Sequence, residues 1–264
     1  MTRIAVLGGG VMGEALIIGL LAQDPSARIV VVEQSAERGD ALVARHGIRL
    51  DTAGAAVAAA DVVIIAVKPD GVRALLQEIA NDVQPGALVI SIAAGIPTSV
   101  ISALVPQAAV VRAMPNTPAR IQQGVIGVSA AQTCPAVSLA IASALLGAVG
   151  TVIQIPEAQQ DAITATSGSG PAYVFYLAEA MMRGAQELGL DPAQARTAVI
   201  ETIAGAAQLM LASDDDPQVL RAQVTSAKGT TAAAIAAFDA SAVADGIVAG
   251  MVAARDRSAE LSQP

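Results

Sequence analysis

The sequence predicts an α/β domain, built on a doubly wound parallel sheet, followed by an all-helical domain. Up to about residue 155, short apolar runs rich in β-branched residues alternate with Ala- and Leu-rich stretches at helical spacing. These runs are apolar throughout, as is typical of parallel strands that are covered on both faces. After Pro156 the strand-like runs stop and helix-like stretches follow. We therefore expect one domain over residues 1–155 and a second over residues 156–264.

The first domain is expected to alternate strands and helices along the chain. The β-branched runs that predict strands are Arg3–Leu7, Arg28–Val32, Val62–Val67, Leu88–Ile92, Val110–Arg112, Val125–Val128 and Val152–Ile155. The stretches between them with helical spacing include Gly13–Gln23, Ala36–His46 and Gly71–Val83.

The second domain reads as a set of amphipathic helices. Asp191 and Pro192 have the character of an N-cap and a first-turn proline. A dimer that shares the apolar faces of these helices would bury more apolar surface than a monomer. The expected helices are Pro171–Gly189, Asp191–Ala212, a stretch from Gly229 onward, and Ser241–Glu260.

The composition excludes several classes of protein. Hydrophobic residues make up 54% of the 264 residues, which is too apolar for a disordered chain. The net charge of −8 and an aromatic content of 2% disfavour nucleic-acid binding. Cys134 and His46 are the only residues of their types, so internal disulfides and metal sites with several cysteines or histidines are excluded. We expect no bound metal and a reducing, cytoplasmic environment.

A membrane span has to be considered because the mean hydropathy is +0.58. The stretch Ile121–Pro156 contains no charged residue, but polar residues, Pro135 and glycines such as Gly147 and Gly150 interrupt it. A spanning helix needs about 20 predominantly apolar residues. We therefore expect no membrane span and no membrane partner.

A glycine-rich turn is the first functional motif. Gly8-Gly9-Gly10-Val11-Met12-Gly13 matches G-x-G-x-x-G between the first strand and the first helix. Gly8 permits the tight turn, Gly10 lets the backbone approach a pyrophosphate, and Gly13 allows the helix to pack closely on the strand. The N–H groups at the start of the helix, including those of Val11 and Met12, suit phosphate. This context is typical of a Rossmann-type dinucleotide-binding domain.

The second strand ends at Glu33, about 20 residues beyond the turn, where an acidic side chain can bind the adenosine ribose hydroxyls. This position favours NADH. Arg38 lies nearby in the sequence and suits a 2′-phosphate, so NADPH stays open.

Four further segments follow in order along the chain. They are Ala66-Val67-Lys68-Pro69, the run Val111–Pro118 with its Met-Pro-Asn core, Gly168–Tyr173, and Val224-Thr225-Ser226-Ala227-Lys228-Gly229-Thr230-Thr231. Together with the glycine-rich turn, this set closely resembles the pyrroline-5-carboxylate reductase family over essentially the whole chain. The last segment is the most specific of them.

The resemblance implies reduction of the C=N bond of 1-pyrroline-5-carboxylate to L-proline by NAD(P)H, the last step of proline biosynthesis. It implies a helical domain that dimerises, with assembly into decamers common in the family. By the resemblance, Val67, Lys68 and Pro69 lie against the nicotinamide half of the cofactor and Ala93 and Ala94 border the nicotinamide. The loop Val224, Gly229, Thr230 and Thr231 holds the substrate carboxylate and ring nitrogen. Ala53 replaces an asparagine with which many family members reach the ribose.

The chemistry agrees with the short inventory of polar groups. A protonated cyclic imine brings its own proton, so its reduction needs no proton donor, whereas reduction of a ketone needs one for the developing alkoxide, often a histidine. The backbone N–H groups at Gly229–Thr231 would bind the carboxylate. The Thr231 hydroxyl would bind the ring nitrogen, and we expect it to be the most important side chain. A purely capping role for Thr231 is the alternative.

Other polar residues have structural explanations as well as functional ones. His46 suits a helix end, Cys134 is expected to be inert, and Asp214–Asp216 suits a solvated turn. Arg112 could bind a phosphate or anchor the end of a strand, and Asn116 is expected to organise a loop. Ser169 could contact the substrate or cap the helix that follows it.

Two other functions are open alternatives. A β-hydroxyacid dehydrogenase would place asparagine four residues after its lysine, whereas Ala232 follows Lys228 here. A dinucleotide sensor without turnover would have no need for the Thr230-Thr231 loop.

Overall fold

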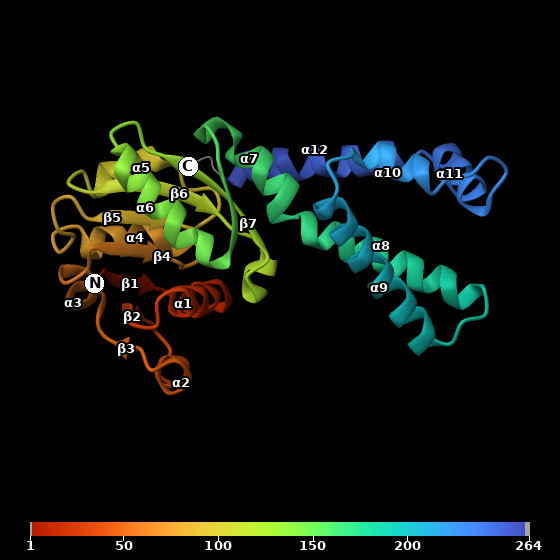
Figure 1. The fold of residues 1–264 in the computed structure, drawn as a ribbon. Coiled ribbons are helices and arrows are strands. Elements are labelled where there is room, and N and C mark those ends of the chain that lie inside the picture. The colour runs from red at the N-terminus through yellow and green to blue at the C-terminus, as the bar shows by residue number, and fades with distance from the viewer. Residues whose placement is uncertain (1, 262–264) are drawn as a thin grey trace. The chain divides into compact units, whose positions relative to one another are not determined.

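The computed structural model describes residues 2–261, shown in Figure 1. Within this range eight strands form one sheet in the order β3-β2-β1-β4-β5-β6-β7-β8. The strands are β1 (Arg3–Leu7), β2 (Arg28–Val32), β3 (Arg49–Leu50), β4 (Val62–Ile65), β5 (Leu88–Ser91), β6 (Ala109–Met114), β7 (Gly124–Ala130) and β8 (Gly150–Gln154).

The predicted α/β fold class is confirmed, and the order of the first six strands is that of a doubly wound sheet. β1 to β6 run parallel, whereas β7 pairs antiparallel with β6. The connection from β6 to β7 holds only the short 3-10 helix η1 (Thr117–Ile121), which is too short for a crossover to a parallel strand. β8 follows a helical crossover and is parallel to β7.

Helices cover both faces of the sheet and fill two apolar cores. Leu16 of α1, Leu42 of α2 and Leu146 of α6 pack on one face. Val57 of α3 and Leu76 of α4, with residues of α5, pack on the other. The helices are α1 (Val11–Gln23), α2 (Ala36–His46), α3 (Ala53–Ala58), α4 (Pro69–Ile79), α5 (Thr98–Leu104) and α6 (Ala136–Leu146).

The chain separates into two compact units. Unit 1 comprises the residues up to Ser169 and those from Ala254 onward, and unit 2 is Gly170–Ala253. The functional boundary expected at residue 155 stays a prediction. Beyond β8 the helices are η3 (Glu157–Gln159), α7 (Gln160–Ile163), η4 (Thr164–Gly168), α8 (Gly170–Glu187), α9 (Pro192–Ala212), α10 (Pro217–Gln223), α11 (Thr230–Ala240) and α12 (Val243–Leu261).

The all-helical character of the second half is confirmed. α9 begins with a capping box, in which Asp191 accepts from the N–H groups of Ala193 and Gln194, both at 2.9 Å. Within unit 1, Ser258 near the end of α12 donates to Asp161 of α7 at 2.7 Å.

Over residues 2–261 no single helix is long and apolar enough to cross a membrane. The pair α11 and α12, bent by 53°, meets the criteria of length and composition only when the two helices are taken together.

Candidate active site

The glycine-rich turn joins β1 to α1 beside β4, where the strand order changes direction. Gly8 has φ +110°, and a Cβ there would lie 2.7 Å from the Ala66 carbonyl oxygen. A Cβ on Gly13 would lie 2.0 Å from the Gly8 carbonyl oxygen. A Cβ on Gly10 would meet no heavy atom within 4 Å. The fold therefore requires Gly8 and Gly13, whereas Gly10 faces open space that a ligand can enter.

The start of α1 offers unused hydrogen-bond donors at that open space. Its first helical bond runs from the Glu14 N–H to the Gly10 carbonyl at 2.9 Å. The N–H groups of Val11, Met12 and Gly13 precede that bond and have no partner inside the helix. The Val11 side chain is 61% exposed, and Met12 packs against the core. Free donors and a positive helix end suit a pyrophosphate, so this turn fits a dinucleotide.

The ends of β4 and β5 lie at the same edge of the sheet as the turn. Lys68 is the N-cap of α4 and Pro69 its first residue, and both side chains are exposed. The Val67 nitrogen would lie 3.1 Å from a Cβ on Gly8. After β5, Ala93 is buried and Ala94 half-buried. Parallel neighbouring strands thus bring all the expected cofactor segments of unit 1 to one edge.

Glu33 follows β2 and is bonded to the turn itself. Its carboxylate accepts from the Gly9 N–H at 2.9 Å and from the Ser35 N–H at 3.0 Å. The carboxylate is therefore held at the corner where the ribose of a dinucleotide lies.

Arg38 is also bonded to the turn. Its Nε donates to the Gly9 carbonyl at 2.9 Å and its Nη2 to Glu14 at 2.6 Å. The same Glu14 carboxylate accepts a hydrogen bond from Arg45 and lies 2.9 Å from Nε2 of His46. Burial alone would raise the pKa of Glu14, but the hydrogen bonds from His46 and Arg38, with the charges of Arg38 and Arg45, lower it. Glu14 was not among the expected site residues, since these contacts join distant positions in the chain.

The Met-Pro-Asn run organises the helix that follows β8. Asn116 is buried, accepts from the Val125 N–H at 2.9 Å and donates to the Ser167 carbonyl at 3.0 Å. Pro171 lacks the N–H that would bond Ser167 in a regular helix. The local helix is instead a π-helix, η4, with the Ser169 N–H bonded to the Thr164 carbonyl at 2.8 Å. Ser169 has helical backbone angles, so it is not an N-cap.

Arg112 anchors the end of β6 through an acid that sequence reasoning missed. Its buried guanidinium lies 3.6 Å from the Glu157 carboxylate. The same carboxylate accepts from the backbone N–H of Thr98 at 2.7 Å and from its hydroxyl at 2.5 Å. Glu157 thereby fixes the start of α5, shortly after Ala93 and Ala94. A signal was available, because Glu157 is the first charged residue after the uncharged stretch Ile121–Pro156.

Unit 2 holds the other expected segment. Gly229 is the N-cap of α11, and the first helical bond runs from the Ala233 N–H to the Gly229 carbonyl at 3.2 Å. The N–H groups of Thr230 and Thr231 therefore have no partner inside the helix. Thr231 is half-buried and is the second residue of α11, so the N-cap is Gly229 and not Thr231. This leaves the Thr231 hydroxyl available to a ligand.

Backbone geometry sets the loop before α11. Lys228 has φ +62°, a conformation that is uncommon outside glycine. A Cβ on Gly229 would lie 2.5 Å from the Ser226 hydroxyl. The side chain of Val224 is 64% exposed. A side chain at position 229 would therefore have to displace the Ser226 hydroxyl, and its Cβ would lie 3.1 Å from the Ser226 carbonyl oxygen.

The remaining candidates are held in structural contacts. His46 ends α2 and contacts Glu14, as described above. Burial raises the pKa of the Cys134 thiol, which makes it less reactive. Asp216 is the N-cap of α10, and Asp215 accepts from Gln223 at 2.9 Å. Among residues 2–261 no three His, Cys, Asp or Glu side chains gather as a metal site would require.

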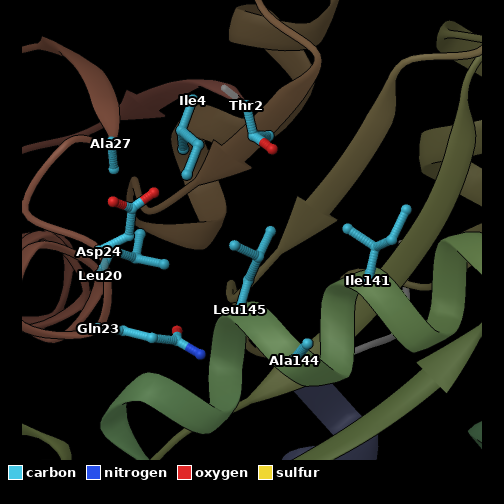
Figure 2. Close-up of a pocket in the computed structure, with 9 residues that line it drawn as sticks. All are labelled: Thr2, Ile4, Leu20, Gln23, Asp24, Ala27, Ile141, Ala144 and Leu145. Atoms are coloured by element: carbon cyan, nitrogen blue, oxygen red, sulfur yellow. The ribbon is translucent and has the colours of Figure 1, made fainter.

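Two cavities lie at the opposite, amino edge of the sheet. One, of about 280 Å³, lies between α1 and α6 and is lined by residues that include Ile4, Leu20 and Ile141 (Figure 2). The other, of about 450 Å³, includes Arg3 and Arg28 at the starts of β1 and β2. Neither includes an expected site residue.

Comparisons with family models match both halves of the chain. Residues 157–261 match the model described as pyrroline-5-carboxylate reductase dimerisation. Residues 3–95 match the model described as NADP oxidoreductase coenzyme F420-dependent.

Individual proteins agree with these models. The chain is 43% identical to a pyrroline-5-carboxylate reductase of Pseudomonas aeruginosa, over 99% of this chain and 97% of the relative. A solved pyrroline-5-carboxylate reductase of Coxiella burnetii superposes with a TM-score of 0.94 at 33% identity, covering 100% and 99% of the two chains. The Plasmodium falciparum pyrroline carboxylate reductase, solved with NADP bound, has a TM-score of 0.88 at 22% identity, covering 99% and 98%.

Proposed function

The chain belongs to the pyrroline-5-carboxylate reductase family, and from this premise we infer that it reduces 1-pyrroline-5-carboxylate to L-proline with a nicotinamide dinucleotide. This reaction is the last step of proline biosynthesis. The observation that carries the inference is the 43% identity to the Pseudomonas aeruginosa reductase across nearly the whole of both chains.

The dinucleotide is assigned to the carboxyl edge of the sheet in unit 1. The pyrophosphate would lie over Gly10 and the free N–H groups of Val11, Met12 and Gly13. Glu33 would accept from the adenosine ribose hydroxyls, which favours NADH over NADPH. The nicotinamide half would lie against the segments Val67–Pro69 and Ala93–Ala94. When bound, the reduced nicotinamide supplies the hydride.

The substrate is assigned to the loop that opens α11. Its carboxylate would be held by Gly229, Thr230 and Thr231, through backbone N–H groups and the positive end of the helix, with Val224 beside the ring. The Thr231 hydroxyl would bind the ring nitrogen. The support is geometric, because these donors have no partner within their own helix.

The protein's part in the chemistry is orientation and charge stabilisation. The imine nitrogen enters already protonated, and hydride adds to the imine carbon. The C=N double bond becomes a single bond, its electron pair goes to nitrogen, and a neutral ring amine results. No side chain has to deliver a proton in that step.

The helical half mediates self-association. Residues 157–261 match a dimerisation model, and unit 2 exposes large apolar side chains such as Tyr176, Leu188 and Leu211, at 75%, 88% and 85%. Apolar surface on this scale is typical of an interface. We propose a homodimer that assembles further, to a decamer as is common in the family. Residues 1–155 would bind the dinucleotide, and residues 156–264 would bind the substrate and dimerise.

We also propose a cytoplasmic location, which the single cysteine supports. The test of function is to follow the loss of nicotinamide absorbance when the purified chain is mixed with pyrroline-5-carboxylate and NADH or NADPH, and to quantify proline. Proline formed in step with cofactor oxidation is expected. No turnover with either cofactor would contradict the proposal.

A further inference from the structure

The residues behind the glycine-rich turn form a charged cluster, which we define as Glu14, Arg38, Arg45 and His46. We propose that Glu14 is a specificity-determining residue: it holds Arg38 against the turn and so withholds it from a 2′-phosphate, which adds to the preference for NADH. The proposal rests on the proposed function in taking a nicotinamide dinucleotide as the ligand, with its adenosine ribose beside Glu33.

The charges that would discriminate NADPH from NADH lie near the end of β2. NADPH differs from NADH by a phosphate on the adenosine ribose, near the end of the second strand. Glu33 occupies that corner, fixed by the N–H groups of Gly9 and Ser35. The Glu33 carboxylate would repel a 2′-phosphate, whereas it can accept a hydrogen bond from a ribose hydroxyl. Arg38 is the third residue of α2, so it begins close to the same corner, and its backbone N–H donates to the Ser35 hydroxyl at 3.3 Å.

The Arg38 guanidinium is bonded to the glycine-rich turn and to Glu14. Nε bonds the Gly9 carbonyl at 2.9 Å, and Nη2 bonds Glu14 at 2.6 Å. Two bonds on one rigid planar group fix both its position and its plane. To bind a 2′-phosphate, the guanidinium would have to give up the bond to Glu14, which is a charge-assisted bond and one of the stronger kinds.

Glu14 is held as a carboxylate by its surroundings. Its side chain is only 14% exposed and carries three basic partners, Arg38, Arg45 and His46. Burial raises the pKa of Glu14. The hydrogen bonds from His46 and Arg38, together with the charges of Arg38 and Arg45, lower it by more. The carboxylate is therefore ionised at neutral pH. These partners also offset the negative charge that Glu14 places in the first turn of α1.

The experiment measures dissociation constants of NADH and NADPH by calorimetric titration, without substrate. The variants are Arg38→Gln, Glu14→Ala and the double variant, with Arg45→Gln as the matched control because it removes a partner of Glu14 without releasing Arg38. Arg38→Gln alone should change NADPH affinity by less than about threefold, because Arg38 does not reach the phosphate. Glu14→Ala should tighten NADPH relative to NADH by about tenfold, the scale of one charge-assisted bond. The double variant should lose that gain, and Arg45→Gln should leave the ratio unchanged.

Two results would overturn the proposal. One is a loss of about tenfold or more in NADPH affinity with Arg38→Gln alone, which would mean that Arg38 already binds the phosphate. The other is an equal gain for both cofactors with Glu14→Ala, which would show a general charge effect. If Glu14→Ala does not fold, the near-isosteric Glu14→Gln is compared in the same way. Failure of the proposed function would appear separately, as cofactor binding with no reduction of pyrroline-5-carboxylate.

Discussion

Replacing Gly10 by alanine should separate cofactor binding from folding. The added Cβ would meet no heavy atom within 4 Å, and the backbone angles, φ −65° and ψ −173°, are open to alanine. Restricting the unfolded chain would stabilise the protein by about 0.4–1 kcal/mol. Losing a favourable N-cap would cost a similar amount, about 0.5–1 kcal/mol. The free energy of unfolding should therefore change by less than about 1 kcal/mol.

The effect on binding should be larger, because the methyl group would occupy the space through which the pyrophosphate approaches. We expect the dissociation constant for NADH to rise by about tenfold or more, which is about 1.4 kcal/mol. Gly13→Ala is the contrasting variant. Its Cβ would lie 2.0 Å from the Gly8 carbonyl oxygen, and real Cβ atoms essentially never approach another heavy atom to within 3.0 Å. It should destabilise the fold by about 1–3 kcal/mol or more.

The assays are thermal unfolding and calorimetric titration of NADH, on the same preparations. Gly147→Ala is the matched control, because it also adds a Cβ to open space but lies far along the chain from the turn. It should change neither quantity appreciably. Unaltered NADH affinity in a folded Gly10→Ala variant would refute the placement of the pyrophosphate.

Three other predictions concern separate parts of the chain. Thr231→Ala should lower kcat/KM for pyrroline-5-carboxylate by about 10- to 100-fold while NADH affinity stays constant; equal loss of both would show a structural role. Asn116→Ala should lower the free energy of unfolding by about 1–3 kcal/mol, because the Val125 N–H loses its acceptor, and an unchanged melting temperature would contradict this. Hydrogen bonds from Arg3 lower the pKa of Asp61 to about 2, so the stability it contributes is present above about pH 4 and is lost as pH falls toward 2. Asp61→Asn should remove that acid-dependent part and, for an exposed pair, cost no more than about 1 kcal/mol at neutral pH.

β2 and α2 were predicted to the residue because local signals bound them, whereas α1, expected over Gly13–Gln23, begins at Val11, and α4, expected over Gly71–Val83, spans Pro69–Ile79. Arg28–Val32 is a β-branched run, and the structure has a strand with the same bounds. Ala36–His46 is bounded by Ser35, whose hydroxyl accepts from the Arg38 N–H, and by Gly47 at φ +66°. α6 was not predicted, because it is apolar on all sides and its sequence lacks helical periodicity.

The elements that depend on distant partners could not be predicted in this way. The π-helix η4 follows from Pro171 together with the Asn116 amide, which lies 51 positions before Ser167 and bonds its carbonyl. Glu14 and Arg38 are 24 positions apart, and only the packed fold brings them together. Motif spacing predicted which backbone donors form the proposed site, because those donors are local features. It did not locate the charges that surround them, since those are set by tertiary contacts.

The fate of the single histidine connects the composition to the chemistry. His46 ends α2 with Nε2 2.9 Å from Glu14, so it is occupied in a cluster behind the cofactor turn. An enzyme that reduces a ketone commonly uses such a side chain to protonate the developing alkoxide. A protonated imine generates no alkoxide, because its nitrogen takes up the electron pair while keeping its proton. A chain whose only histidine is in contact with Glu14 can thus still carry out hydride transfer, provided that its loop donors hold the substrate in place.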